Sequence, residues 1–234
     1  MTTPMFIWLG AGRARRHHVG SPARLLDQAA TAGLPVPAGA VVLDAFFHFS
    51  LTHGLAQANG GVVIPDAELW HNTLHDSAHL PRFRRPVDVY AVAAEPTPGL
   101  SVPLGRAVEF NDPHAAARAL ERVWSVTRLA AEPPRRDALI VETVAAAMAG
   151  TATTVTDQPA DRIALTHSPD SGFDLPQLSG RRRPDSDQPP YARRLQQLLR
   201  GARRTFGRGA WQIAWADDGA ICWLLLAAAL ETPG

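Results

Sequence analysis

Residues 19–47 read VGSPARLLDQAATAGLPVPAGAVVLDAFF, and this stretch carries the strongest structural signal in the chain. Its apolar spacing predicts a helix over residues 24–32, and Gly33 stands where a C-cap would end that helix. Two prolines then force an extended backbone that leads into a strand over residues 40–43. Asp44 is expected to cap the helix that follows. The stretch therefore predicts a helix, a strand and a second helix in close succession.

The remaining elements also alternate between helices and short strands. We expect helices over residues 45–55, 65–79, 113–131 and 191–206, the third of them capped by Asp112. We expect strands over residues 5–9, 87–94, 138–144, 150–156, 162–166, 211–215 and 220–226. The turn Asp217-Asp218-Gly219 is typical of a hairpin, and residues 180–190 are Pro-rich and polar, as in a surface loop. The pattern predicts an α+β protein with mostly antiparallel sheets.

Composition excludes several classes of protein. The chain has 234 residues, 46% of them hydrophobic, and a formal charge of +1, so neither disorder nor nucleic-acid binding is expected. All 23 basic residues are arginine. The single cysteine, Cys222, excludes an internal disulfide and lies in an apolar run, where it is expected to be buried. The start does not resemble a signal peptide, and residues 221–230 are too short to cross a bilayer, so we expect a cytoplasmic protein without membrane contact.

Four segments resemble a known domain, in the same order. They are residues 19–47, residues 87–97, the stretch LIVETVAAAMAGTATT at 139–154 and the stretch FGRGAWQIAWADDGAICWLLLAA at 206–228. The chain resembles the nucleotide-binding domain of phosphoenolpyruvate synthase and pyruvate phosphate dikinase. This resemblance implies a two-lobed ATP-grasp fold, in which ATP lies between antiparallel sheets. It implies a single domain over residues 1–234, with lobes at 1–135 and 136–234.

The resemblance fails at the positions that bind ligands in this family. Pro22 stands in place of the phosphate-binding lysine, and Tyr90 in place of an arginine. A glutamine position of the family holds Val141, or Glu142 if a one-residue gap is allowed, and Leu225 and Ala227 replace a glutamine and an arginine. Gln212 and Ala214 stand where the family has an aspartate and its metal-binding glutamate. Phosphoryl transfer depends on positioning and on neutralising the charge of the phosphates. The resemblance therefore implies a degenerate, non-catalytic domain that acts by binding a ligand or a protein partner, with no cofactor expected.

An active enzyme is the alternative. An ATP-dependent phosphotransferase would use Mg-ATP and work with a partner chain that carries a phosphohistidine domain. Its cations would come from Arg13, Arg15, Arg16 or Arg106, and its Mg²⁺ would bind Glu95 and Glu142. The basic group at residues 13–18 is equally typical of a solvated loop. A second alternative is an unrelated α+β binding protein, and no residue is assigned a catalytic role.

Two further groups of side chains allow a binding interpretation. His71, His75 and His79 recur at the i, i+4 and i+8 positions of an expected helix, and adjacent pairs have the spacing of helical zinc sites. A solvated helix face explains these histidines as well, and no metal is expected. Residues 181–183 are three successive arginines, which would contact an acidic partner or keep the loop soluble.

Overall fold

The computed structural model describes residues 4–77, 79–80, 82–92, 100–126, 135–180 and 182–230. Within these ranges helices alternate with strands, and every paired strand is antiparallel to its neighbour. The α+β class with antiparallel sheets is confirmed. The chain divides into two compact units: unit 1 holds residues 1–23, 38–95 and 101–143, and unit 2 holds residues 24–37, 96–100 and 144–234. The sequence predicted a second lobe over residues 136–234. In the structure the last segment of unit 2 begins at residue 144, and unit 2 also includes residues 24–37.

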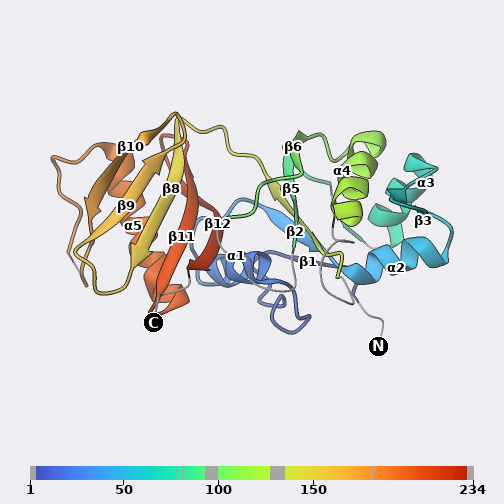
Figure 1. The fold of residues 1–234 in the computed structure, drawn as a ribbon, viewed down its shortest axis with the longest axis horizontal. Helices are drawn as coiled ribbons and strands as arrows, with labels where there is room; N and C mark the ends of the chain where they lie inside the picture. The colour runs from blue at the N-terminus through green and yellow to red at the C-terminus, as the bar shows by residue number, and fades with distance from the viewer. Residues whose placement is uncertain are drawn as a thin grey trace. The chain divides into compact units, whose positions relative to one another are not determined.

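Unit 1 contains a five-stranded sheet with the order β1-β2-β7-β5-β6 and helices on one side of it (Figure 1). The strands are β1 (Phe6–Trp8), β2 (Gly39–Val42), β5 (Val87–Ala91), β6 (Gly105–Val108) and β7 (Ala138–Glu142). The helices are α2 (Asp44–Thr52), α3 (Ala67–Asn72), which continues as the π-helical turn η1 (Thr73–Ser77), and α4 (Pro113–Val126). A short hairpin, β3 (Gln57–Ala58) and β4 (Val62–Val63), completes the unit.

The core of unit 1 is an aromatic cluster between the helices and the sheet. Phe46, Phe47, Trp70 and Trp124 are all fully buried. The Phe47 and Trp124 rings meet edge to face with centroids 5.2 Å apart, and Phe46 lies 5.8 Å from Trp70. Such geometry adds to the free energy gained by burying the rings. The cluster explains why α2, α3 and α4, which are distant in sequence, form one layer.

The start of α2 differs from the expectation. Asp44 does not cap this helix, because it is the first helical residue and Leu43 holds the N-cap position without a side-chain bond. Instead, the backbone N–H of Asp44 donates to Oδ1 of Asp137, at 2.8 Å. Asp44 Oδ1 in turn accepts from the backbone N–H of Arg136, at 3.0 Å. A carboxylate from a distant part of the chain thus satisfies one of the free N–H groups at the helix start.

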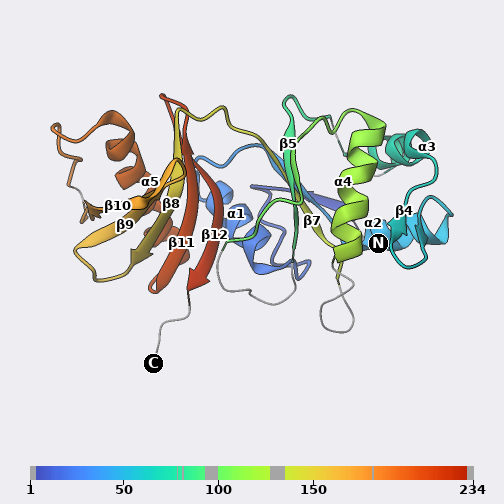
Figure 2. The ribbon, with the colours of Figure 1, turned by 45° about the horizontal axis from the view of Figure 1, so that its top comes forward.

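Unit 2 is built on a second five-stranded sheet, with the order β10-β9-β8-β11-β12 (Figure 2). Its strands are β8 (Met148–Val155), β9 (Ala160–Leu165), β10 (Ser168–Pro176), β11 (Ala210–Asp217) and β12 (Cys222–Leu230). Helix α5 (Pro190–Phe206) packs on one face through Leu195, Leu199 and Ala202, which are fully buried. Helix α1 (Ser21–Thr31) contributes its residues from Arg24 onward, and Gln28 Nε2 donates to the carbonyl of Thr205 at 2.6 Å.

Two ion pairs fasten α5 to the sheet. Arg194 makes a two-pronged contact with Asp217, at 2.6 and 2.7 Å. Arg203 Nη1 donates to both carboxylate oxygens of Asp161, at 2.8 and 2.9 Å. Both carboxylates are buried, which makes these pairs sensitive to the loss of either partner.

Most of the expected elements are present, and the differences have local causes. The helix expected over residues 65–79 begins at Ala67, capped by Asp66, and ends at Ser77. Strand β12 continues past residue 226, its expected end, to Leu230. The sequence missed β3, β4, β6 and β10, which are short or interrupted. Cys222 is buried as expected, and burial raises the pKa of its thiol to about 12.

Candidate functional site

The face of the second sheet opposite α5 holds the positions at which the resemblance places metal ligands. Because Thr154, Asp161 and Trp215 contact α5, strand alternation puts Gln212 and Ala214 on the other face. We call this surface the neutral face; it consists of half-buried Thr151, Thr153, Ala164, Gln212 and Ala214. Gln212 pairs with Thr153 on β8, and Ala214 pairs with Thr151. The residues of the neutral face offer hydroxyl and amide groups, whereas the exposed Arg162, opposite Thr153 on β9, and the exposed Asp174, opposite Arg162 on β10, lie on the same side of the sheet.

The other substituted ligand positions serve the packing. Tyr90 is buried in β5, and burial raises the pKa of its phenol well above the ordinary value. Val141 is buried in β7, and Ala227 is fully buried in β12. Pro22 is the second residue of α1, where a missing N–H costs no helical hydrogen bond. These side chains fit their local structure and offer no contact for a phosphate.

The enzyme interpretation assigns arginines to the phosphates and glutamates to Mg²⁺, and the described members of this set are not linked to one another in unit 1. Arg13, Arg15 and Arg16 are exposed in the turn between β1 and α1, and Arg106 is exposed on β6. Glu142 ends β7, and its Oε1 accepts from the backbone N–H of Arg84 at 2.9 Å. Within the described residues, no hydrogen bond or ion pair links these groups to one another. Glu95 lies outside the described residues.

The structure brings His71 and His75 together and leaves His79 apart. Their Nε2 atoms are 3.1 Å apart, His71 Nε2 also contacts the carbonyl of Phe110 at 3.1 Å, and His75 Nδ1 contacts the carbonyl of Leu80. Since a carbonyl only accepts, His75 carries its proton on Nδ1, and its Nε2 accepts from His71. Burial is the main cause that lowers the pKa of both rings.

His79 is exposed after the end of η1, with φ at 58°, because the helix stops before it. Across the described ranges, no group of three or more His, Cys, Asp or Glu side chains has the arrangement of a metal site. His71 and His75 form a hydrogen-bonded pair, in which His71 is buried.

None of the helices in the described ranges combines the length and the hydropathy of a membrane-spanning segment.

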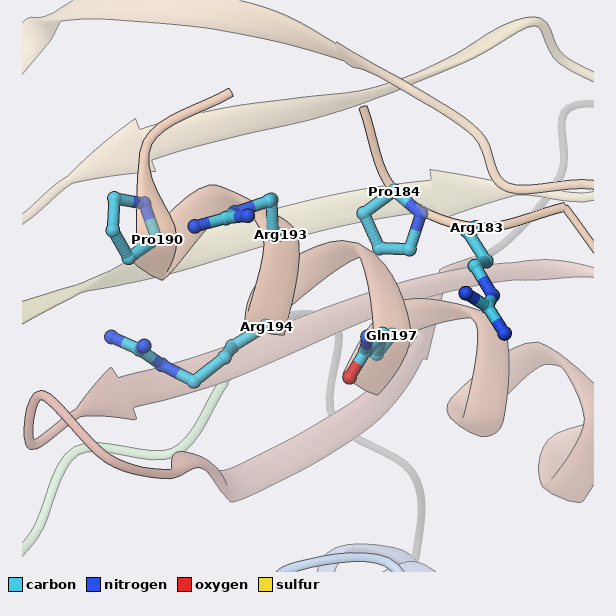
Figure 3. A pocket seen from close by; sticks show the side chains of 6 residues that line it. All are labelled: Arg183, Pro184, Pro190, Arg193, Arg194 and Gln197. Atoms are coloured by element: carbon cyan, nitrogen blue, oxygen red, sulfur yellow. The ribbon is translucent and has the colours of Figure 1, made fainter. Parts of the chain in front are cut away.

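Three adjoining pockets lie between α5 and the loop that precedes it, all within unit 2. The first has a volume of about 410 Å³, and Figure 3 shows Arg193, Arg194 and Gln197 extending from α5 and Arg183 from the loop. A second, of about 520 Å³, extends under the loop to Gln196, and the third reaches Arg200 and Arg204. All three share Arg183 and Pro184. We call this surface the arginine cleft; its cationic residues are Arg182, Arg183, Arg193, Arg200 and Arg204.

The arginine cleft is a site that sequence reasoning found only in part. The run at 181–183 indicated an acidic partner, but Arg181 lies outside the described residues. The arginines of α5 were assigned no role. The helical spacing of Arg193, Arg200 and Arg204 was the signal that would have revealed one basic face of α5.

No family model matches the chain, and no curated protein matches it. Among solved structures, D-alanine-D-alanine ligase from Helicobacter pylori is similar with a TM-score of 0.46 and 11% identity, over 87% of this chain and 51% of that one. Carboxyaminoimidazole ribonucleotide synthase from Aspergillus clavatus, complexed with ATP, has a TM-score of 0.42 and 10% identity, over 89% and 44% of the two chains.

The ATP-grasp ligase PsnB, complexed with a minimal precursor, has a TM-score of 0.40 and 12% identity, over 96% and 56%. The chain spans about half the length of these structures. With TM-scores below 0.5, the likenesses do not by themselves assign an activity to this chain.

Proposed function

We propose that this chain is a binding protein of ATP-grasp type, related to the nucleotide-binding domain of phosphoenolpyruvate synthase and pyruvate phosphate dikinase, that no longer transfers phosphate. It acts by binding a ligand or a protein partner. The observation that carries the proposal is the neutral face of the second sheet. Gln212 and Ala214 occupy the positions at which the resemblance places acidic residues, and their cross-strand neighbours are threonines on β8 and the apolar Ala228 and Leu226 on β12.

The chemistry of phosphoryl transfer supports this reasoning. Mg²⁺ bound to a nucleotide is held by carboxylates, and cations neutralise the charge that develops on the phosphates. Gln212 and Ala214 supply neither group, and the charged residues on the same side of the sheet, Arg162 and Asp174, stand opposite each other on β9 and β10. In unit 1, Glu142 already accepts a backbone N–H, and Pro22 brings neither a charge nor a donor to the start of α1.

The test is thermal unfolding with and without Mg-ATP, together with an assay for ADP release. A ligand at 100 times its dissociation constant adds about 2.7 kcal/mol of stability. In a chain of this size that corresponds to roughly 5 to 10 °C in Tm. We expect millimolar Mg-ATP to leave Tm unchanged and to yield no ADP, with Mg²⁺ alone and ATP with EDTA as controls.

The same experiment decides the competing enzyme interpretation. Formation of ADP, or a rise in Tm with Mg-ATP that the Glu142→Gln variant abolishes, would overturn the proposal. That result would favour an ATP-dependent phosphotransferase working with a phosphohistidine partner chain. A triple Arg→Ala change at residues 13, 15 and 16 would then show whether the exposed turn supplies the cations. His114→Ala, an exposed change on α4, is the matched control for that triple variant.

A further inference from the structure

The arginine cleft carries positive charge that the protein itself does not neutralise. Of the seven described arginines between residues 182 and 204, only Arg194 and Arg203 pair with a carboxylate. Among described residues, the guanidinium groups of Arg183 and Arg193 form no hydrogen bond or ion pair. Because a guanidinium group remains charged at every physiological pH, the other five arginines stay positive. Their mutual repulsion favours an anionic occupant.

Two of these arginines hold the cleft in shape. Arg200 Nη1 donates to the carbonyl of Arg182 at 2.8 Å, and Arg204 Nη2 donates to the carbonyl of Gly180 at 2.8 Å. These bonds tie the loop to α5 without neutralising either guanidinium, and each group keeps further N–H donors. The loop and the helix therefore form a preorganised wall of donors, with Arg183 and Arg193 free to contact a ligand.

The length of the cleft indicates what kind of anion fits. Arg193, Gln197, Arg200 and Arg204 follow the spacing i, i+4, i+7 and i+11, so they form one stripe along α5. At 1.5 Å per residue this stripe is about 16 Å long. A single phosphate or carboxylate cannot reach both ends. An extended peptide covers the same length with about five residues, and its alternate side chains point to the same side.

The lining favours a peptide over a nucleic acid. Besides arginine, the three pockets are lined by proline, glutamine and small polar or aliphatic groups, including Pro184, Pro190 and Gln197. Sites for single-stranded nucleic acid use aromatic side chains on which bases stack, and none of these lining residues is aromatic.

A second copy of this chain is a poor occupant, because its alternating acidic segments, Asp66-Ala67-Glu68 and Asp185-Ser186-Asp187, hold only two carboxylates each. In the pair Asp217-Asp218, Asp217 is already buried against Arg194. The occupant therefore comes from another protein.

We infer that the arginine cleft binds an acidic segment of a partner protein, about five residues long, in an extended conformation. The inference specifies the kind of partner that the proposed function leaves open. It rests on the proposed function in one respect, namely that the chain works by binding a partner. Bidentate contacts between guanidinium and carboxylate groups would provide both affinity and direction. The carboxylates of the segment would replace the missing internal counter-charges.

The test is fluorescence anisotropy with a labelled peptide that has glutamate at every second position, without ATP. The matched peptide has glutamine at the same positions. We expect the glutamate peptide to bind at least about tenfold more tightly than the glutamine peptide, and to bind more weakly as salt rises. Equal affinity of the two peptides would overturn the inference.

Variants then locate the site. R183Q/R193Q removes two guanidinium groups that form no hydrogen bond or ion pair with the described residues, so its Tm should equal that of the wild type while affinity falls about tenfold. R118Q, an exposed change on α4, is the matched control and should bind as the wild type does. Unchanged affinity in R183Q/R193Q would refute the assignment.

Competition with millimolar inorganic phosphate and with oligo(dT) completes the test. Displacement of the peptide by phosphate at equal concentration, or tighter binding of oligo(dT), would also overturn the inference. Failure to bind the peptide leaves the proposed lack of phosphoryl transfer intact, because that is decided by Mg-ATP alone.

Discussion

Replacing Arg203 with alanine should destabilise unit 2 more than any other single arginine change on α5. Arg203 Nη1 donates to Oδ1 and Oδ2 of Asp161 and to Oγ1 of Thr154, all within 2.9 Å. Asp161 is fully buried, and the Arg203 side chain is 13% exposed. The substitution therefore leaves a carboxylate in the core of the unit without its counter-charge.

The structure sets the size of the effect. Breaking a buried ion pair by removing one partner costs about 3 to 5 kcal/mol. One hydrogen bond to Asp161 survives, because Gln177 Nε2 donates to its Oδ1 at 2.8 Å. Nη2 of Arg203 has no partner, so the wild-type pair is itself incompletely satisfied. We therefore take the lower end, about 3 kcal/mol, which corresponds to a fall of roughly 6 to 12 °C in Tm.

The assay is thermal unfolding followed by circular dichroism, with urea unfolding as a second measurement. Arg204→Ala is the matched control. Arg204 is exposed and bonds only the carbonyl of Gly180, so its loss should cost less than about 1 kcal/mol. The double variant Asp161→Asn with Arg203→Met removes both charges and should recover part of the loss. Arg203→Ala with the stability of Arg204→Ala would refute the reasoning, as would a double variant less stable than Arg203→Ala.

Three further predictions follow from the geometry. Because burial lowers the folded-state pKa of His71, the unfolded chain binds more protons than the folded chain below about pH 6.5. The free energy of unfolding should therefore fall as the pH drops below that value, and it should fall less steeply in His71→Gln. Urea unfolding at several pH values would show the difference. Gly150→Ala should lower the free energy of unfolding by about 1 to 3 kcal/mol or more, since the added Cβ would lie 2.1 Å from the carbonyl oxygen of Ala164. Urea unfolding measures this change, and an unchanged stability would contradict the close approach of β8 and β9. The hydrogen bond from Trp223 Nε1, together with two bonds from backbone N–H groups, lowers the pKa of Asp218 to about 2. The stability that ionised Asp218 contributes is therefore complete above about pH 4 and is lost toward pH 2. Titration of the carboxyl group by NMR checks this, and a pKa near 3.8 would contradict it.

Local signals in the sequence predicted most elements of the fold. Apolar periodicity located α1, α4 and α5, and the Asp217–Gly219 turn located the last hairpin. Asp112 caps α4 as expected, and its Oδ1 accepts from the N–H of Ala115 at 2.7 Å. These features depend on neighbouring residues, so a single sequence contains them.

The candidate site was less accessible from the sequence. The resemblance identified Gln212 and Ala214 as substituted positions, and the structure places both on the neutral face. Nothing local indicated that Asp137 would bond the start of α2, because the two segments are far apart in the chain. The helix carrying His71 and His75 was expected, but its end before His79 was not.

The sequence by itself determined the order of the elements and the antiparallel class. Only the tertiary structure decided which arginines are neutralised. Arg194 and Arg203 flank the buried face of α5 on either side and meet buried carboxylates, whereas Arg193, Arg200 and Arg204 lie along the side of the helix that faces away from the sheet. The reason is physical: helical spacing fixes which residues share a face, but the charge on that face depends on what the fold packs against it.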